Sequence, residues 1–179
     1  EDVPRRVDRH RAGVGSGLLG KGEAVRAGIE LRTGNEDVHL EVVDLSSQES
    51  VREGVARFLA REERLDVLIN NAGVLLPQRL ESVDGIEMTL ATNVLGPFLL
   101  TSLSLPVLRA SAPARIVNVS SVAGLAGNAG QANYAAAKAG VHHLTRALAK
   151  EWAAKGVNVN AVAPCITETT RSRPMPKPA

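Results

Sequence analysis

Extended and helical segments alternate along the chain from residue 21 onward, and this alternation restricts the fold more than any other feature. Strands are predicted over 38–45, 65–69, 114–119 and 157–163, and those over 65–69 and 114–119 are expected to be buried. Helices are predicted over 21–32, from Ser46 onward, over 84–109 and over 132–155. Strands separated by helices of these lengths need crossover connections, which produce a parallel sheet. The pattern therefore predicts an α/β fold that binds ligands beyond the carboxyl ends of its strands.

Glycine, proline and capping residues mark the expected ends of these helices. Gly34 would close the first helix and Gly156 the last. Ser46, followed three residues later by Glu49, has the pattern of a capping box. The next helix carries an apolar stripe of Val51, Val55, Phe58 and Leu59, and the first strand an apolar face of Val38, Leu40 and Val42. Pro97 lacks the backbone N–H that a helix uses, so we expect a bend there.

Length and composition favour a single globular domain. The chain has 179 residues, of which 44% are hydrophobic, and this is enough for one core. Only 2% are aromatic, so the core must consist mainly of Ala, Val, Leu and Ile. The single cysteine, Cys165, cannot form an internal disulfide, and no CxxC or Cys/His cluster offers a metal site. A lone thiol also favours a reducing compartment.

Charge and hydropathy argue against two classes of partner. The net charge of +2 is too small to favour nucleic acid, and the basic cluster of Arg5, Arg6, Arg9 and Arg11 is expected to be a solvated end. No run approaches the ~18 apolar residues that span a bilayer, and residues 1–11 are charged where a signal peptide would be apolar. We therefore expect a cytoplasmic protein with neither a nucleic-acid partner nor a membrane.

Tyr134 and Lys138 are the first candidates for chemistry. They lie four residues apart on the predicted helix over 132–155, so both side chains can address one ligand. A free tyrosine is a poor base at neutral pH, but a neighbouring ammonium stabilises its phenolate. The pair could therefore transfer a proton. The alternative is a chance spacing of two surface residues.

Ser121 is the third candidate. It follows the predicted strand over 114–119 and precedes Tyr134 by thirteen residues, so the strand end and the next helix can bring the two hydroxyls together. A hydroxyl there could hold a substrate oxygen while Tyr134 gives or takes the proton. The alternative for Ser121, and for its neighbour Ser120, is a turn or helix-cap hydroxyl.

Several stretches resemble, in order and spacing, the landmarks of the short-chain dehydrogenase/reductase family. They are LDVLINNAG, TNVLGPFLLT, ARIVNVSSVAG, GQANYAAAKAGVHHLTRALAKEWAAKGVNVNAVAP and ITET, and the resemblance covers roughly residues 37–170. Residues 124–169 look more like bacterial 3-oxoacyl-acyl-carrier-protein reductases, whereas residues 21–105 look more like retinol dehydrogenase relatives. The resemblance implies a Rossmann-like doubly wound parallel sheet and an NAD(P)-dependent oxidoreductase acting on a carbonyl or secondary alcohol.

The resemblance also implies roles for individual residues. Tyr134 would be the general acid/base, Lys138 would stabilise its phenolate and hold the nicotinamide ribose, and Ser121 would polarise the substrate oxygen. Asn93 would bind a water at the helix bend and connect Lys138 to solvent. The other residues expected to contact the cofactor are Asp44 and Leu45 at the adenine, Asn71, Ala72 and Gly73 on the adenosine side, and Pro164, Thr167 and Thr169 at the carboxamide. NADP(H) is favoured over NAD(H), and the family implies a homodimer or homotetramer.

Three further residues invite roles that the pattern does not support. His142 and His143 are adjacent, so they point to different sides of a helix and cannot form a metal pair. Trp152 is expected to be a packing or interface residue. Cys165 stands where the family usually has glycine, and we interpret it as a tolerated departure rather than a nucleophile.

The ends of the chain depart from the family pattern. The family begins with a buried strand and a TGxxxGxG turn, whereas residues 15–20 satisfy only GxGxxG and follow a charged stretch, as a flexible glycine loop would. In the family's sheet order, the two strands that are not legible lie between those predicted over 38–45 and 65–69. We therefore expect one partial domain over 21–170, incomplete at both ends, with an atypical segment over 1–20 and an irregular tail over 171–179.

Three functions remain open at this stage. The first is the oxidoreductase, supported by Ser121, Tyr134 and Lys138 together. The second is a catalytically impaired remnant that acts as an interaction or assembly module, suggested by the missing phosphate loop and the two long helices. The third is a truncated gene product without a stable fold, suggested by the loss of pattern before residue 21.

Overall fold

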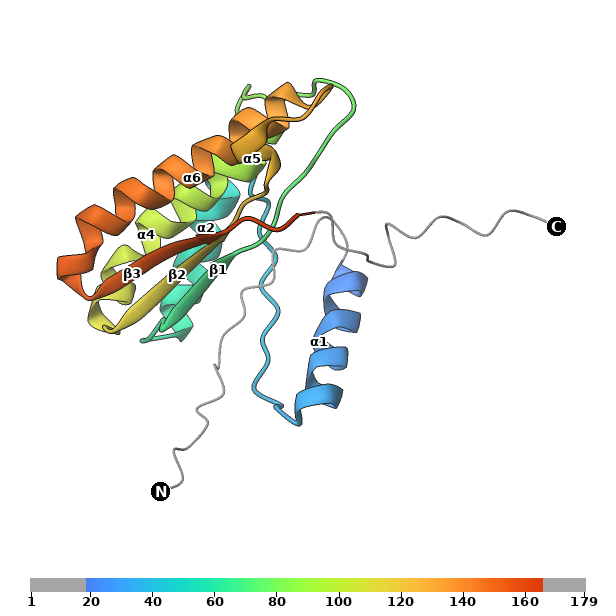
Figure 1. The fold of residues 1–179 in the computed structure, drawn as a ribbon. Helices are drawn as coiled ribbons and strands as arrows, with labels where there is room; N and C mark the ends of the chain where they lie inside the picture. The colour runs from blue at the N-terminus through green and yellow to red at the C-terminus, as the bar shows by residue number, and fades with distance from the viewer. Residues whose placement is uncertain (1–18, 166–179) are drawn as a thin grey trace.

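The computed structural model describes residues 19–165 and contains a three-stranded parallel sheet covered on one face by helices (Figure 1). Its strands are β1 (Val67–Asn70), β2 (Ala114–Val119) and β3 (Val157–Val162), in the order β1-β2-β3. Helix α4 (Gly96–Ala110) connects β1 to β2, and helix α6 (Ala132–Trp152) connects β2 to β3. The predicted α/β fold with a parallel sheet is confirmed.

The main core lies between the sheet and its helices. Alternate residues of the strands are buried on the helix-covered side, as the two-residue period of a strand requires. They pack with residues of α4 and α6 in one cluster of Leu65, Leu68, Val107, Leu108, Ala114, Ile116, Leu148, Trp152, Val157 and Val159. Trp152 is 5% exposed, so its expected packing role is confirmed. On the opposite side of the sheet, Ile69 is 46% and Val162 is 52% exposed.

Helix α2 (Gln48–Arg61) begins one residue later than the capping-box pattern suggested. Ser47, not Ser46, is the N-cap, and its hydroxyl accepts the backbone N–H of Ser50 at 3.3 Å. Ser46 is otherwise engaged, because both its N–H and its hydroxyl donate to Asp44. The expected stripe is buried at Val51 and Val55 and half-buried at Phe58, whereas Leu59 is exposed.

The strand predicted over 38–45 is wrong: residues 34–45 form an extended segment outside the sheet. A strand needs a neighbour for its backbone hydrogen bonds, and within residues 19–165 no strand lies beside this segment. The expected apolar face also fails, since Val42 is 44% exposed. Val43 and Leu45 are buried instead, and they form a second small cluster with Val51 of α2.

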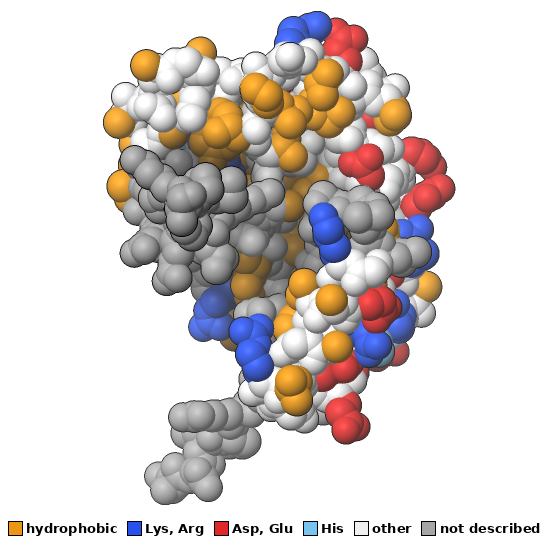
Figure 2. All heavy atoms as spheres, turned by 90° about the vertical axis from the view of Figure 1, so that its right-hand side faces the viewer, with side chains coloured by type: hydrophobic (Ala, Val, Ile, Leu, Met, Phe, Trp, Pro, Cys, Tyr) orange, Lys and Arg blue, Asp and Glu red, His pale blue; other side chains and the backbone are white. Residues whose placement is uncertain are grey.

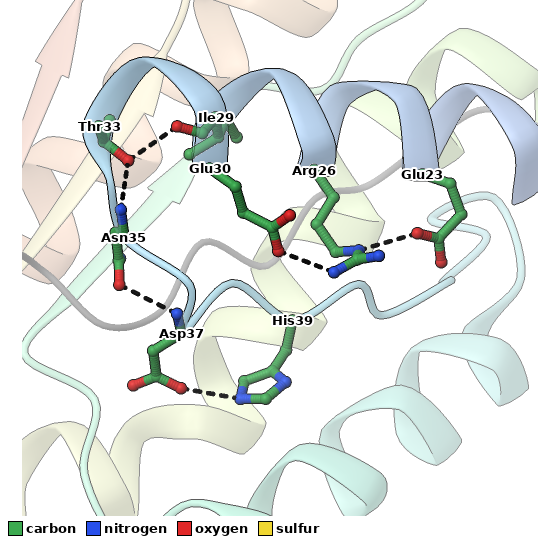
Figure 3. A network of polar contacts seen from close by, with 8 residues as sticks. All are labelled: Glu23, Arg26, Ile29, Glu30, Thr33, Asn35, Asp37 and His39. Carbon is green, nitrogen blue, oxygen red and sulfur yellow. Dashed lines mark hydrogen bonds and ion pairs between the residues drawn. The ribbon is translucent and has the colours of Figure 1, made fainter.

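Helix α1 (Leu19–Thr33) stands apart from the helices that cover the sheet (Figure 1). It ends at Gly34, which has the left-handed φ of 67° expected for a helix C-cap. Figure 3 shows that side chains of α1 and of the segment after it bind mainly one another: Arg26 bridges Glu23 and Glu30, and Asp37 accepts from the His39 ring. This end of the chain is therefore held largely by local contacts.

The helix predicted over 84–109 is divided. Gly85 has a positive φ of 72° within a turn over residues 83–86, and the helix begins at α3 (Met88–Leu90) with Glu87 as its N-cap. A π-helical turn, Ala91–Leu95, follows and runs into α4. The expected irregularity is present as this π-helical turn, which lies immediately before Pro97, a residue without the N–H that a helix uses.

The stretch Met88–Ala110 is long and apolar enough to cross a membrane by length and composition alone, so the expectation that no such run exists is wrong. Core helices pass the same test, and α4 packs against α2, β1 and β2. Figure 2 shows a different face of the molecule, on which hydrophobic side chains gather centrally and charged side chains lie mainly toward the margins.

Candidate active site

Polar residues collect where the three parallel strands end. Asn71 follows β1, Ser121 follows β2 at one residue's distance, and Pro164 follows β3. Two backbone bonds join the last two ends: Ser120 N donates to Val162 O at 2.8 Å, and Val122 N donates to Pro164 O at 3.2 Å. The sheet edge that the sequence assigned to ligand binding is thus a connected surface.

Lys138 lies under this edge. Its side chain is carried by the second turn of α6 and is only 4% exposed. The ammonium donates to Val119 O at 2.9 Å and lies 5.8 Å from the centre of the Tyr134 ring. Burial lowers the pKa of Lys138 below its ordinary value of 10.5, because removal from water disfavours the charged form. An ammonium has three donors, and this is the one hydrogen bond that Lys138 Nζ makes within residues 19–165.

Tyr134 and Ser121 approach the same region from two elements. Tyr134 lies in the first turn of α6 and is half-buried, and Ser121 is half-buried in the loop before helix α5 (Ala123–Ala126). The Ser121 hydroxyl accepts from Ala123 N at 3.2 Å, so its own hydrogen can be donated elsewhere. Gly124 lets the loop close on α6, since a Cβ there would lie 2.6 Å from the carbonyl carbon of Lys138.

Asn93 is buried in the π-helical turn and is 2% exposed. Its side chain binds the backbone of Val74 twice: Oδ1 accepts from Val74 N at 2.7 Å, and Nδ2 donates to Val74 O at 2.9 Å. These bonds fix the loop after β1 to the helix. The role of Asn93 in a proton relay stays a prediction.

Gly73 lies between Asn93 and Lys138. A Cβ at this position would lie 3.2 Å from Asn93 Oδ1 and 3.4 Å from Lys138 Nζ. Beside Asn93 is a cavity of about 20 Å³ that reaches Ala72 and the buried side chains of Asn70, Thr101 and Asn118. This volume is sufficient for about one water molecule with several polar partners. The bare backbone at 73 thus passes close to both the Asn93 amide and the Lys138 ammonium.

Asp44 and Leu45, the residues expected at the adenine, lie in the segment before α2 and not at the end of a strand. Asp44 is exposed, and its carboxylate accepts from Ser46 N at 2.8 Å and from the Ser46 hydroxyl at 2.7 Å. Leu45 is buried, and its backbone passes so close to Gly96 that no side chain would fit there. Thr167 and Thr169 lie outside the described residues. Within residues 19–165, no group of three His, Cys, Asp or Glu side chains could hold a metal.

Two residues that sequence reasoning left without a role, Ser120 and His142, belong to the site. The Ser120 hydroxyl donates to Lys138 O at 2.9 Å and lies 3.1 Å from the His142 ring nitrogen Nε2. His142 is buried, whereas its neighbour His143 is exposed. A signal was present, because His142 lies four residues after Lys138 and so shares its helix face. The adjacency of the two histidines excludes a metal pair, but it does not indicate the contact between His142 and Ser120.

Comparison with known proteins identifies relatives across nearly the whole chain. A family profile described as short chain dehydrogenase matches residues 14–178. Retinol dehydrogenase 13 of Homo sapiens is 39% identical over 166 residues, which are 86% of this chain and 50% of that protein. The 3-oxoacyl-acyl-carrier-protein reductase of Thermotoga maritima is 38% identical over 141 residues, or 77% of this chain and 57% of that protein. The chain spans about half the length of the curated relatives it matches.

Solved structures share the same fold. The Pseudomonas aeruginosa RhlG/NADP active-site complex superposes with a TM-score of 0.71 at 36% identity, covering 84% of this chain and 61% of that one. Levodione reductase superposes with a TM-score of 0.70 at 32% identity, covering 80% of this chain and 57% of the other. Both values confirm the Rossmann-like fold expected from the sequence.

Proposed function

Because the chain belongs to the short-chain dehydrogenase family, we propose that it is an NAD(P)-dependent oxidoreductase acting on a carbonyl or secondary alcohol. The observation that carries the proposal is the buried ammonium of Lys138 beside the Tyr134 ring, at the edge where the parallel strands end. A buried cation held by one backbone carbonyl costs free energy. A functional requirement accounts for its retention.

The residues present fit a nicotinamide cofactor at this edge. The two open donors of Lys138 suit the hydroxyls of a ribose, and the bare backbone of Gly73 leaves room for a ligand to approach them. Asn71, Ala72 and Pro164 would line the rest of the site, with Thr167 and Thr169 following in sequence. Asp44 and Leu45 would contact the adenine. A bound nicotinamide cofactor would supply or accept the hydride.

Within the chain, Tyr134 gives the proton to the substrate oxygen in the reductive direction, and Ser121 donates a hydrogen bond to the same oxygen. Lys138 stabilises the phenolate that remains. Asn93, beside the small cavity, would bind a water that connects Lys138 to solvent, so that the proton can be replaced. These roles assign Asn93, Ser121, Tyr134 and Lys138 to one reaction.

We propose NADP(H) as the preferred cofactor and a homodimer or homotetramer as the assembly. The first is supported by the NADP complex of the RhlG relative. The second follows from the long helices α4 and α6, which the family resemblance assigns to subunit contacts. Light scattering of the purified chain tests the assembly, and a monodisperse monomer would contradict it. The same result would count against the assembly-module alternative.

The decisive test of function is the Tyr134→Phe variant, which removes one hydroxyl and keeps the ring. We expect NADPH-dependent reduction of a panel of small ketones and aldehydes to fall by about a hundredfold or more, the usual contribution of a positioned acid/base group. Asn133→Ala, at the neighbouring exposed position, serves as the control. Equal rates for Tyr134→Phe and the unmodified chain would refute the proposed function.

A further inference from the structure

The strand end that carries Ser121 and the helix that carries Lys138 are joined by one imidazole ring. His142 lies one helical turn after Lys138 on α6, and it is 8% exposed. Its Nε2 lies 3.1 Å from the Ser120 hydroxyl and 3.3 Å from the backbone carbonyl of Ser121. His143 faces solvent, and its Nδ1 lies 3.1 Å from the carbonyl of Ala139 in its own helix.

The hydrogen positions in this cluster follow from the partners. Ser120 has one hydroxyl hydrogen and donates it to Lys138 O at 2.9 Å, so its oxygen must accept from His142. The Ser121 carbonyl can only accept. Both contacts therefore require a hydrogen on Nε2 of His142, and the neutral ring must be the Nε2–H tautomer.

The cluster connects the backbone of two proposed catalytic residues. The Ser120 hydroxyl donates to the Lys138 carbonyl. The single Nε2–H of His142 is shared between the Ser121 carbonyl and the Ser120 hydroxyl oxygen. Sequential bonds of this kind are buried here, where an unsatisfied partner is costly. Fixing both carbonyls fixes the distance between the loop that aims Ser121 and the turn of α6 that aims Tyr134 and Lys138.

We propose that His142 is a positioning residue that sets the register between Ser121 and the Tyr134–Lys138 pair through its Nε2–H bonds. The inference rests on the proposed function, because register matters only if the three side chains act on one substrate. His142 contacts neither substrate nor cofactor, and it acts through Ser120 and the Ser121 carbonyl. Small errors in such alignment reduce turnover without abolishing binding.

Three variants of the full chain test the proposal: His142→Leu, which removes the donor, His142→Gln, which retains an amide N–H at a similar reach, and the exposed control His143→Leu. We expect His142→Leu to lower kcat with NADPH and a ketone about tenfold, while the Kd for NADPH changes by less than about twofold. His142→Gln should recover most of the rate, and His143→Leu should match the unmodified chain.

Equal loss in His142→Leu and His142→Gln, or a change confined to KM or to thermal stability, would overturn the proposal. Imidazole nitrogen chemical shifts provide a readout that needs no activity, and they should show the Nε2–H tautomer for His142. If the unmodified chain reduces no carbonyl, the proposed function fails separately. The tautomer then decides: Nε2–H supports the bridge between Ser120 and Ser121, and Nδ1–H contradicts it.

Discussion

The two ends of the proposed cofactor site are built in different ways. At the nicotinamide end, Lys138, Ser120 and His142 are buried and bonded to one another across β2 and α6. At the adenine end, Asp44 belongs to an extended segment that has no strand beside it within the described residues, and its hydrogen bonds within those residues are to Ser46, Ser47 and Ser50. The first end is formed by elements consecutive in sequence.

The comparison indicates that the residues proposed for catalysis and those proposed to bind the adenine depend on different parts of the fold. The β2–α5–α6 unit and β3 place Ser121, Tyr134 and Lys138 with contacts made inside residues 114–164. The segment over 34–45 depends on neighbours to become a strand. Mutations in the β2–α5–α6 unit and mutations in the segment over 34–45 should therefore differ in their effects.

The largest expected contrast concerns stability. Ile116 is fully buried at the centre of β2, and Ile116→Ala should lower the free energy of unfolding by about 3 kcal/mol through lost burial and a residual cavity. Leu40→Ala, in the extended segment, should cost less than about 1 kcal/mol because Leu40 is half-exposed. Chemical denaturation followed by Trp152 fluorescence measures both. Similar losses of unfolding free energy in the two variants would contradict the proposed difference between the two regions.

Lys138→Met should separate function from stability. Removing the ammonium should reduce NADPH-dependent turnover by about a hundredfold or more. The same change should raise the free energy of unfolding by about 1 kcal/mol, since an apolar side chain replaces a desolvated charge. Initial rates and denaturation curves on one preparation give both values. Loss of stability together with activity would show that Lys138 is a structural residue.

Gly73→Ala probes the loop after β1, beside Lys138. The new methyl group would lie 3.2 Å from Asn93 Oδ1 and 3.4 Å from Lys138 Nζ, so we expect roughly tenfold weaker NADPH binding. Gly140→Ala is the matched control, because its nearest contacts are 3.9 Å away and alanine favours a helix interior. It should leave binding unchanged and add about 0.5–1 kcal/mol of stability. Equal binding by the two variants would contradict the close approach at Gly73.

The smallest expected effect is a dependence of stability on pH. The pKa of Lys138 is lowered in the folded state, so between that value and 10.5 the unfolded chain binds more protons. The penalty is complete below the folded pKa and is relieved as the pH rises through this window. The stability advantage of Lys138→Met should therefore shrink as the pH approaches 10.5. A constant difference at all pH values would mean that Lys138 is not desolvated.

Sequence predicted the elements whose formation is local or whose neighbours are consecutive. β2, α6 and its closing Gly156 lie where periodicity placed them, and the Tyr134–Lys138 spacing placed both residues on one helix face. The strand over 38–45 could not be judged in this way, because periodicity reports a buried face and says nothing about available partners. Gly85 likewise moved the start of a helix that apolar spacing alone had placed at 84.

The sequence predicted the identities of the site residues better than the hydrogen bonds between them and other elements. Motif resemblance indicated Asn93, Ser121, Tyr134 and Lys138, but it could not show that Asn93 binds Val74 or that Lys138 binds Val119 O. Such bonds depend on the meeting of a helix with a distant strand end. The adjacency of His142 and His143 excludes a metal pair, but adjacency alone could not show that His142 is buried while His143 is exposed.

The most direct test of the central claim, that the Lys138 ammonium forms a cofactor site at the strand ends, is a fluorescence titration of the chain with NADPH and with NADH. Lys150→Ala, an exposed lysine on the same helix, is the control for Lys138→Ala. We predict saturable binding that favours NADPH, persists in Lys150→Ala and is lost in Lys138→Ala. Binding that survives in Lys138→Ala, or no binding by the unmodified chain at millimolar cofactor, would contradict the claim.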